Sequence, residues 1–120
     1  MPRDARAYLS DILESCDAIA TALAGMDVDG YLSNRLVRSS IERELTIVGE
    51  AIAVLSRNAP DVFMAITQAR RIVDFRNQLT HEYPLIDDEA VWAIAQRDVP
   101  VLRAECEALL ARLEAAAGAE

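Results

Sequence analysis

Apolar side chains recur at intervals of three and four residues along most of the chain, which is the spacing of one face of an α-helix. The first run ends before Gly25, a residue type that often follows the last turn of a helix. Residues 26–33, with two aspartates and Gly30, predict a connection. No segment of useful length alternates apolar and polar residues as a strand would. The apolar positions of this first helix are Leu9, Ile12, Cys16, Ile19 and Leu23.

A second helix is predicted from about Ser33 to Arg57, and its apolar residues form two adjacent stripes. A helix that is apolar over so much of its circumference is either central to a bundle or part of a subunit interface. Its polar edge carries Arg43, Glu50 and Arg57 at seven-residue spacing. The first stripe comprises Val37, Ile41, Leu45, Val48, Ile52 and Leu55, and the second comprises Ile47, Ala51 and Val54.

Pro60 breaks the second helix, either as a first-turn residue or as a stop, and Asp61 is the expected N-cap of a short helical turn through Ile66. A third long helix is then predicted over about residues 68–82. Its apolar positions, Ile72, Phe75 and Leu79, are expected to face the core.

The third helix should end near His81 to Tyr83, because Pro84 biases the preceding residue out of the α region. The acidic run at residues 87–89 then places negative charge where the dipole of a last helix favours it. This helix continues in phase through Pro100, so we expect a kink there rather than an end. Its stripe is Trp92, Ala95, Val99, Leu102, Cys106, Leu109 and Leu113.

These segments predict an all-α protein, an antiparallel bundle of four long helices with one short extra helix. We expect a single domain over residues 1–117 and a frayed tail at 118–120. Apolar residues make up 52% of the chain and aromatic residues 5%, so the core must be aliphatic, as helix packing allows.

Two cysteines, Cys16 and Cys106, occupy apolar helical positions. They predict buried thiols in a reducing compartment, with a disulfide as the alternative. We expect no leader sequence and no membrane association, because no apolar run approaches the roughly 20 residues that cross a bilayer. The cytoplasm is the expected location.

The formal net charge of −8 argues against a protein that coats nucleic acid generally. All twelve cationic residues are arginine, a bias that a GC-rich genome could produce without functional meaning. Arginine is also the better group for two-pronged phosphate contacts. The sequence therefore leaves open the alternative that an acidic protein carries a local basic cleft.

His81 is the only histidine; it follows Arg76 by five residues and precedes Tyr83 by two. Five helical steps are about 140° of rotation, so Arg76 and His81 would not share a tight face, whereas Asn77 and His81 would. A distorted last turn, or a kink before Pro84, could bring Arg76 and His81 to one pocket. Taken alone, a histidine near a helix C-terminus is more often structural, because the dipole stabilises its cation.

The run from Arg76 to Asp87, RNQLTHEYPLID, resembles the R-x4-H-x-Y signature of HepT-like toxins in the HEPN superfamily. Residues 47–51 resemble the "IGEA" turn of the family's second helix. Residues 91–94 and 98–102 resemble its "VW-x-I" and "D-L-P-x-L" steps. Their order and spacing fit over about residues 5–115.

The resemblance implies a helical bundle that forms homodimers and a metal-independent ribonuclease with Arg76 and His81 as the catalytic pair. Asn77 and Tyr83 would support the site. It implies no cofactor, and the single histidine and separated cysteines offer no metal-ligand cluster. It further implies the toxin of a type VII-like toxin–antitoxin system. Its partner, a minimal nucleotidyltransferase (MNT-type) antitoxin, would transfer AMP to Tyr83 and make the toxin a phosphoprotein.

Cleaving RNA without a metal requires a base, an acid and a cation at the phosphorus. A histidine can supply either proton role, but each chain has only one. A two-fold dimer would place two copies of Arg76 and His81 around one cleft. The candidate RNA-binding residues beside it are Arg70, Arg71 and Arg43; the alternative is that the arginines are ion-paired, for example Arg38 with Glu42.

Two other interpretations stay open. The bundle could be a catalytically silent partner or regulatory subunit of a nucleotidyltransferase. It could also be a structural helical protein whose motif is coincidental. A ribonuclease assay with a His81→Ala control separates the first of these from an enzyme.

Overall fold

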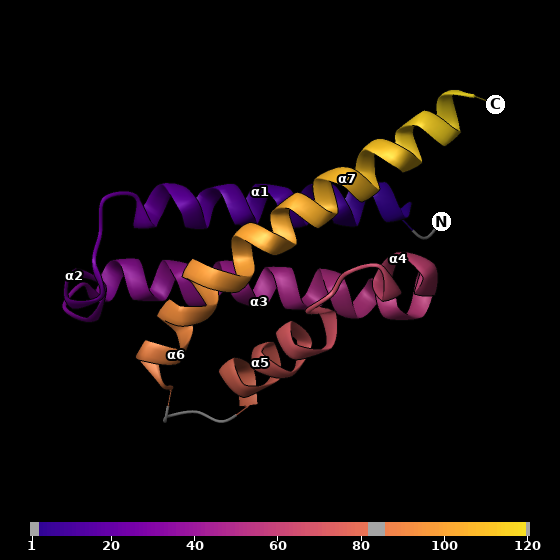
Figure 1. Ribbon diagram of the computed structural model, residues 1–120. Helices are drawn as coiled ribbons and strands as arrows, with labels where there is room; N and C mark the ends of the chain where they lie inside the picture. Colours follow the sequence, from indigo (N-terminus) through magenta and orange to yellow (C-terminus); the bar gives the residue numbers. More distant parts are fainter. Residues whose placement is uncertain (1–2, 82–85, 120) are drawn as a thin grey trace.

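The computed structural model describes residues 3–81 and 86–119, and throughout these ranges the long elements are helices (Figure 1). Four long helical segments follow one another in alternating directions, which confirms the predicted all-α bundle. Short helices lie in two of the connections. The elements are α1 (Ala5–Leu23), α2 (Val28–Leu32), α3 (Arg35–Asn58), α4 (Pro60–Met64), α5 (Ala69–His81), α6 (Asp88–Ala93), a π-helical turn (Ile94–Asp98) and α7 (Val99–Gly118).

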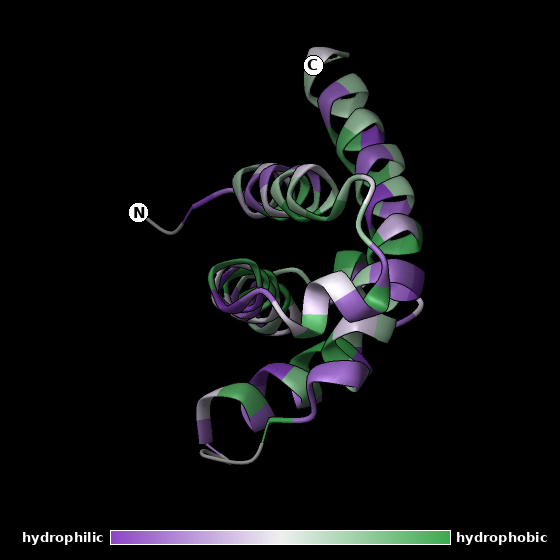
Figure 2. Ribbon diagram, turned by 90° about the vertical axis from the view of Figure 1, so that its left-hand side faces the viewer, coloured by the Kyte–Doolittle hydropathy of each residue, from purple (hydrophilic) through white to green (hydrophobic). Residues whose placement is uncertain are grey.

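Helix α3 lies at the centre of the bundle. Figure 2 shows α1, α3 and α5 side by side, with the α6–α7 helix crossing one side of them. The first predicted stripe of α3 is buried from Ile41 to Leu55; in the second stripe Ala51 is buried and Ile47 and Val54 are half-buried. The breadth of its apolar surface is therefore explained by contacts with α1 on one side and α5 on the other.

Polar side chains define where the helices begin. The Asn34 side chain accepts a hydrogen bond from the Val37 N–H (3.1 Å) and caps α3. The Asp87 carboxylate accepts hydrogen bonds from two backbone N–H groups, including that of Ala90 (3.1 Å), and caps α6. Helix α1 ends before Gly25, whose φ of 74° lies in the left-handed region that glycine adopts without strain.

The N-cap predicted for Asp61 is wrong. The capping position is two residues earlier, at Ala59, so helix α4 begins at Pro60 and Asp61 lies in its first turn. Proline suits this position because its missing N–H would have had no helical partner there.

The predicted connection over residues 26–33 contains helix α2, which the apolar spacing did not reveal. This helix places Tyr31 in the core with 0% exposure, its ring tilted against Trp92 at a centroid distance of 5.3 Å. The Tyr31 hydroxyl is buried without a hydrogen-bond partner in the described ranges, and burial raises the pKa of this phenol. An aromatic side chain within a polar segment was the one sequence signal for this anchor.

The last helix passes through Pro100 without ending, as predicted, and the irregularity lies just before it. Residues Ile94–Asp98 form a π-helical turn, in which the Val99 N–H donates to the Ile94 carbonyl. Pro100 has no N–H to donate to the carbonyl four residues earlier, and the wider turn precedes this gap. The turn also buries Asp98, which is 9% exposed.

Cys16 and Cys106 are both buried and both free thiols, which confirms the predicted pair of buried thiols and not the disulfide. Burial raises the pKa of each to about 12. In the portion of the chain that the structure describes, no helix is long and apolar enough to cross a membrane.

Candidate active site on helix α5

Helix α5 carries the predicted motif along the edge of the bundle, packed against α3. Only Ala69 and Ile72 of this helix are buried, while Phe75 and Leu79 are half-buried against the core. These apolar residues therefore face inward as predicted. Tyr83, the predicted supporting residue and modification target, lies outside the described residues.

Arg76 lies on the side of α5 that faces α3. Its stem packs against Gly49, and its Nε atom is shielded from solvent with no hydrogen-bond partner in the ranges 3–81 and 86–119. No described carboxylate forms an ion pair with it, whereas five other arginines do so: Arg3, Arg6, Arg38, Arg71 and Arg103. The guanidinium thus keeps its charge and its donors for another partner.

His81 and Asn77 are exposed on the outer face of α5, one turn apart. The helix stays α-helical through His81, so the rotation of about 140° between Arg76 and His81 is retained. The structure therefore brings Asn77 and His81 together and leaves Arg76 on the inner side. The possible kink before Pro84 falls outside the described residues.

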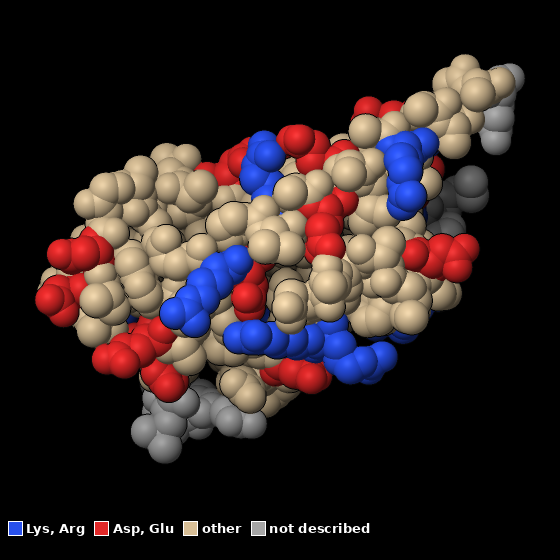
Figure 3. Space-filling view, in the orientation of Figure 1, with Lys and Arg blue, Asp and Glu red and all other residues tan. Residues whose placement is uncertain are grey.

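The three candidate RNA-binding arginines do not form one cluster. Arg71 Nε lies 3.5 Å from Asp98 Oδ2, and the Arg70 guanidinium lies over the Phe63 ring at 5.8 Å from its centroid. Both belong to the first turn of α5, where Figure 3 shows arginine side chains gathered over α5 and the neighbouring α6–α7 helix, with acidic side chains between them.

Arg43 belongs to a different part of the surface. It is exposed on α3, whereas Arg70 lines a hollow with Ser56, thirteen positions further along that helix. Thirteen residues correspond to about 20 Å of helix axis. Within one chain Arg43 is therefore separated from Arg70 and Arg71.

The ion pair suggested for Arg38 forms with a different acid. Arg38 Nε lies 3.6 Å from Asp88 Oδ2, at the start of α6, and the guanidinium also donates to the Leu32 carbonyl. The predicted partner Glu42 is partly buried, and this burial, followed by the charge of Asp88, raises the pKa of its carboxyl. The i, i+4 spacing could not show Asp88, because that contact depends on the packing of α6.

A hollow of about 460 Å³ separates α5 from α6. Its polar lining includes Gln78, which lies one turn from Asp74 and two turns from Arg71 on the same face of α5. Sequence reasoning did not select Gln78, although its spacing within the motif could have indicated it. The hollow is lined by Arg71, Asp74, Phe75, Gln78, Ala90, Ala93 and Ile94.

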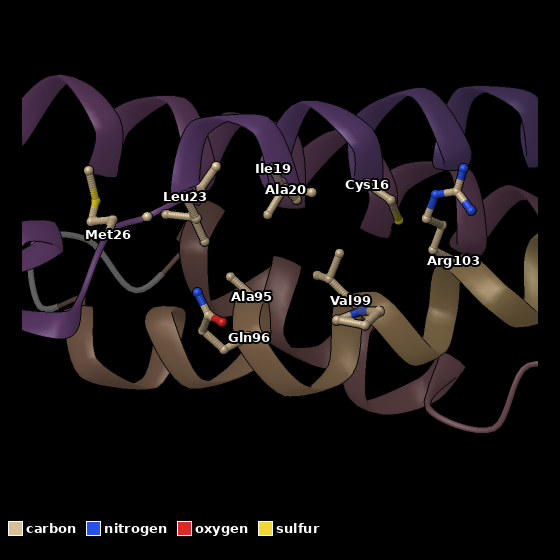
Figure 4. A pocket seen from close by; sticks show the side chains of 12 residues that line it. Cys16, Ile19, Ala20, Leu23, Met26, Ala95, Gln96, Val99 and Arg103 are labelled. Carbon is tan, nitrogen blue, oxygen red and sulfur yellow. The ribbon is translucent and has the colours of Figure 1, made fainter.

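A second groove, of about 420 Å³, lies between α1 and the start of α7 (Figure 4). Its walls are mainly aliphatic, with Cys16 and Met26 contributing sulfur, and its cation Arg103 is paired with Asp17 and Glu107. No motif residue lines this groove. Across the described ranges, no group of three potential ligands among His, Cys, Asp and Glu is arranged to hold a metal ion.

Comparison with known proteins agrees with the motif. A family model described as "Ribonuclease HepT-like" matches residues 12–109. The protein named "Putative RNase MJ1380" of Methanocaldococcus jannaschii is 32% identical over 105 residues, covering 88% of this chain and 95% of that protein. The "Probable ribonuclease HepT" of Thermococcus cleftensis is 28% identical over 112 residues, covering 91% and 98%. No solved structure matches the chain.

Proposed function

This chain belongs to the ribonuclease HepT-like family, and from that premise we propose that it is an endoribonuclease that uses Arg76 and His81 without a metal ion. The observation that carries the proposal is the state of Arg76. It is a partly buried cation with no described carboxylate beside it, on the helix that also exposes His81 and Asn77. An unpaired, pre-oriented guanidinium suits the two non-bridging oxygens of a phosphodiester.

The proposed reaction is a transesterification. A base removes the proton of the ribose 2′-hydroxyl, the 2′-oxygen attacks phosphorus, and the bond from phosphorus to the 5′-oxygen breaks as an acid protonates that oxygen. Imidazole can fill either role near neutral pH, and arginine stabilises the negative charge that develops on phosphorus. The products would be a 2′,3′-cyclic phosphate and a 5′-hydroxyl.

A second copy of the chain would complete this site. The regular α-helix keeps Arg76 and His81 about 140° apart, and each chain has one histidine for two proton transfers. A two-fold homodimer in which the α5 helices approach each other would offer two copies of each residue to one phosphate. Arg70 would then extend the cationic surface along α5, whereas the charge of Arg71 is paired with Asp98.

Purified protein tests these statements in sequence. Wild-type protein should cleave single-stranded RNA in the presence of a chelator, and His81→Ala should not. In mixed dimers, one intact chain paired with one His81→Ala chain should have far less than half the activity of the intact dimer. Activity proportional to the number of intact chains would indicate independent sites, and loss of activity in chelator would contradict the metal-free reaction.

The toxin–antitoxin role is part of the same proposal. A nucleotidyltransferase partner would catalyse attack of the Tyr83 hydroxyl on the α-phosphorus of ATP, with pyrophosphate leaving. The AMP group would bring negative charge and bulk beside the motif and block RNA phosphate by occupancy and repulsion. Tyr83→Phe tests this step: if the partner still neutralises this variant fully, AMP transfer to Tyr83 is not the essential event.

The second candidate function is a catalytically silent partner of the nucleotidyltransferase. The observation in its favour is the distance around the helix between Arg76 and His81 within one chain. Cleavage of RNA by the wild-type protein and not by His81→Ala would rule it out. Equal, background-level cleavage by both would support it.

A further inference from the structure

Helix α5 approaches α3 very closely where Arg76 meets Gly49. Gly49 is buried in the middle of α3, and a Cβ atom built on it would lie 2.6 Å from Arg76 Cγ and still closer to Arg76 Cβ. It would also lie 3.6 Å from the Ile72 carbonyl oxygen. Since Cβ atoms do not approach other carbons this closely, the two helices can adopt this separation only with glycine at position 49.

The atoms involved are the first two carbons of the arginine side chain. The Cβ atom is fixed to the α5 backbone and cannot swing away as the far end of a long side chain can, so a methyl group at position 49 would displace α5 itself. The next polar atom along the stem, Nε, is shielded from solvent and has no hydrogen-bond partner in the described parts of the chain. Among the described residues, packing and not a carboxylate determines the direction in which the guanidinium leaves the helix.

We propose that Gly49 is a positioning residue for Arg76, and this proposal rests on the function proposed above. Gly49 touches no reacting atom. Its lack of a side chain lets the Arg76 stem pack directly against α3, which fixes the orientation in which the guanidinium meets RNA phosphate. The other apolar contacts of α5 are made by Ala69 and Ile72, which are buried, and by Phe75 and Leu79, which are half-buried against the core. The ion pair of α5 with the π-helical turn, between Arg71 and Asp98, lies five residues earlier.

The first test measures RNA binding apart from catalysis. In a His81→Ala background, the affinity for a labelled single-stranded oligoribonucleotide is determined at several salt concentrations. The slope of log K against log salt is negative, and loss of one phosphate contact reduces its magnitude by about 0.7. Gly49→Ala and Arg76→Ala should each show this loss, and the two changes combined should show it only once. The control is Gly118→Ala, at a helical glycine with nothing within 4 Å of a built Cβ, which should behave as the parent does.

The second test examines the contact itself by urea denaturation. Gly49→Ala should lower the unfolding midpoint when residue 76 is arginine and should not lower it in an Arg76→Gly chain, where the overlapping carbons are gone. If Gly49→Ala prevents folding, Arg76→Gly should restore it. Equal destabilisation in both backgrounds, or no rescue of folding by Arg76→Gly, would contradict the proposed contact between Gly49 and the Arg76 stem.

The two proposals fail in distinguishable ways. If Arg76→Ala leaves RNA cleavage and the salt slope unchanged, the catalytic assignment is wrong. If Arg76→Ala abolishes cleavage while folded Gly49→Ala retains the wild-type kcat/KM and salt slope, only the positioning role is wrong. The expected result for Gly49→Ala in the His81-intact chain is at least a tenfold loss of kcat/KM.

Discussion

Helices α1 and α5 both pack on α3, and they differ in how much of the core they contribute. Helix α5 buries only Ala69 and Ile72 and leaves most of its circumference polar. Helix α1 buries six residues, Leu9, Ile12, Ser15, Cys16, Ile19 and Leu23. The difference separates a scaffold, made by α1, α3 and α7, from an edge helix that carries the motif. Because α5 shares little core, the position of its side chains depends on a few close contacts.

The arginines of the two regions differ in the same way. Arg103 joins α7 to α1, with Nε 2.6 Å from Asp17 Oδ1 and Nη1 2.9 Å from Glu107 Oε2. Arg76 has no such acid among the described residues and is held by its stem. A neutralised arginine can link helices but has little charge left for a ligand. An arginine oriented by packing alone can bind an incoming anion.

The largest effect should separate these two arginines. Arg76→Ala should reduce RNA cleavage by at least about 100-fold, because one preorganised donor to a developing charge has effects of that size. Arg103→Ala should leave the rate within about twofold of wild type, since its charge is already satisfied. Initial rates on a short labelled RNA measure both, with circular dichroism to confirm folding. Equal losses in the two variants would contradict the distinction between an arginine that links helices and one that binds RNA.

The two buried thiols of the scaffold should react slowly with thiol reagents. Burial raises the pKa of Cys16 and Cys106 to about 12, so at pH 8 each stays protonated, and the thiolate is the form that reacts. Native protein should react with a disulfide reagent about 100-fold or more slowly than protein unfolded in guanidinium. Rapid reaction of either thiol in native protein would show that the contact between α1 and α7 opens readily.

Hydrogen exchange compares the two helices directly. Amides in the middle of α5 should exchange about tenfold or more faster than those in the middle of α1, because local opening of α5 exposes less apolar surface. Mass spectrometry of proteolytic fragments provides the measurement. Equal protection would mean that α5 opens only with the whole bundle. RNA or a second chain should selectively slow exchange in α5.

The smallest effect concerns stability in salt. Arg103→Ala should lower the thermal midpoint slightly in dilute buffer, and the difference from wild type should shrink as salt is raised to 1 M, because exposed ion pairs are screened. Differential scanning fluorimetry at several salt concentrations gives the comparison. A difference that persists at 1 M would point to packing of the Arg103 stem in place of charge.

The repeated apolar spacing was enough to place the four long helices. The end of α3 was predicted within a residue, since Pro60, two residues after Asn58, cannot continue that helix. Tyr31 was missed because a five-residue helix is too short to show a period. The π-helical turn was missed because the sequence placed the irregularity at Pro100, whereas it lies in the turn just before that residue.

The site could be predicted only in its residue identities. The family resemblance selected Arg76 and His81 as candidates, and helical spacing correctly indicated that they do not share a helix face. It could not show that Arg76 turns toward α3, because that depends on which helix packs beside α5. Gly49 was visible only as part of a family-like segment, and its contact with Arg76 joins residues 27 positions apart.

Gly49 also has a consequence for engineering this protein. Replacing glycine by alanine inside a helix is a standard stabilising change, favoured by roughly 1 kcal/mol of helix propensity. A thermostability programme guided by propensity would select Gly49 early, since it is a glycine in the middle of a 24-residue helix. Here that change should lower both activity and the stability of the bundle, because the overlap with the Arg76 stem outweighs the gain in helix propensity. Exposed Gly118 is the safer position, because a methyl group there meets nothing within 4 Å.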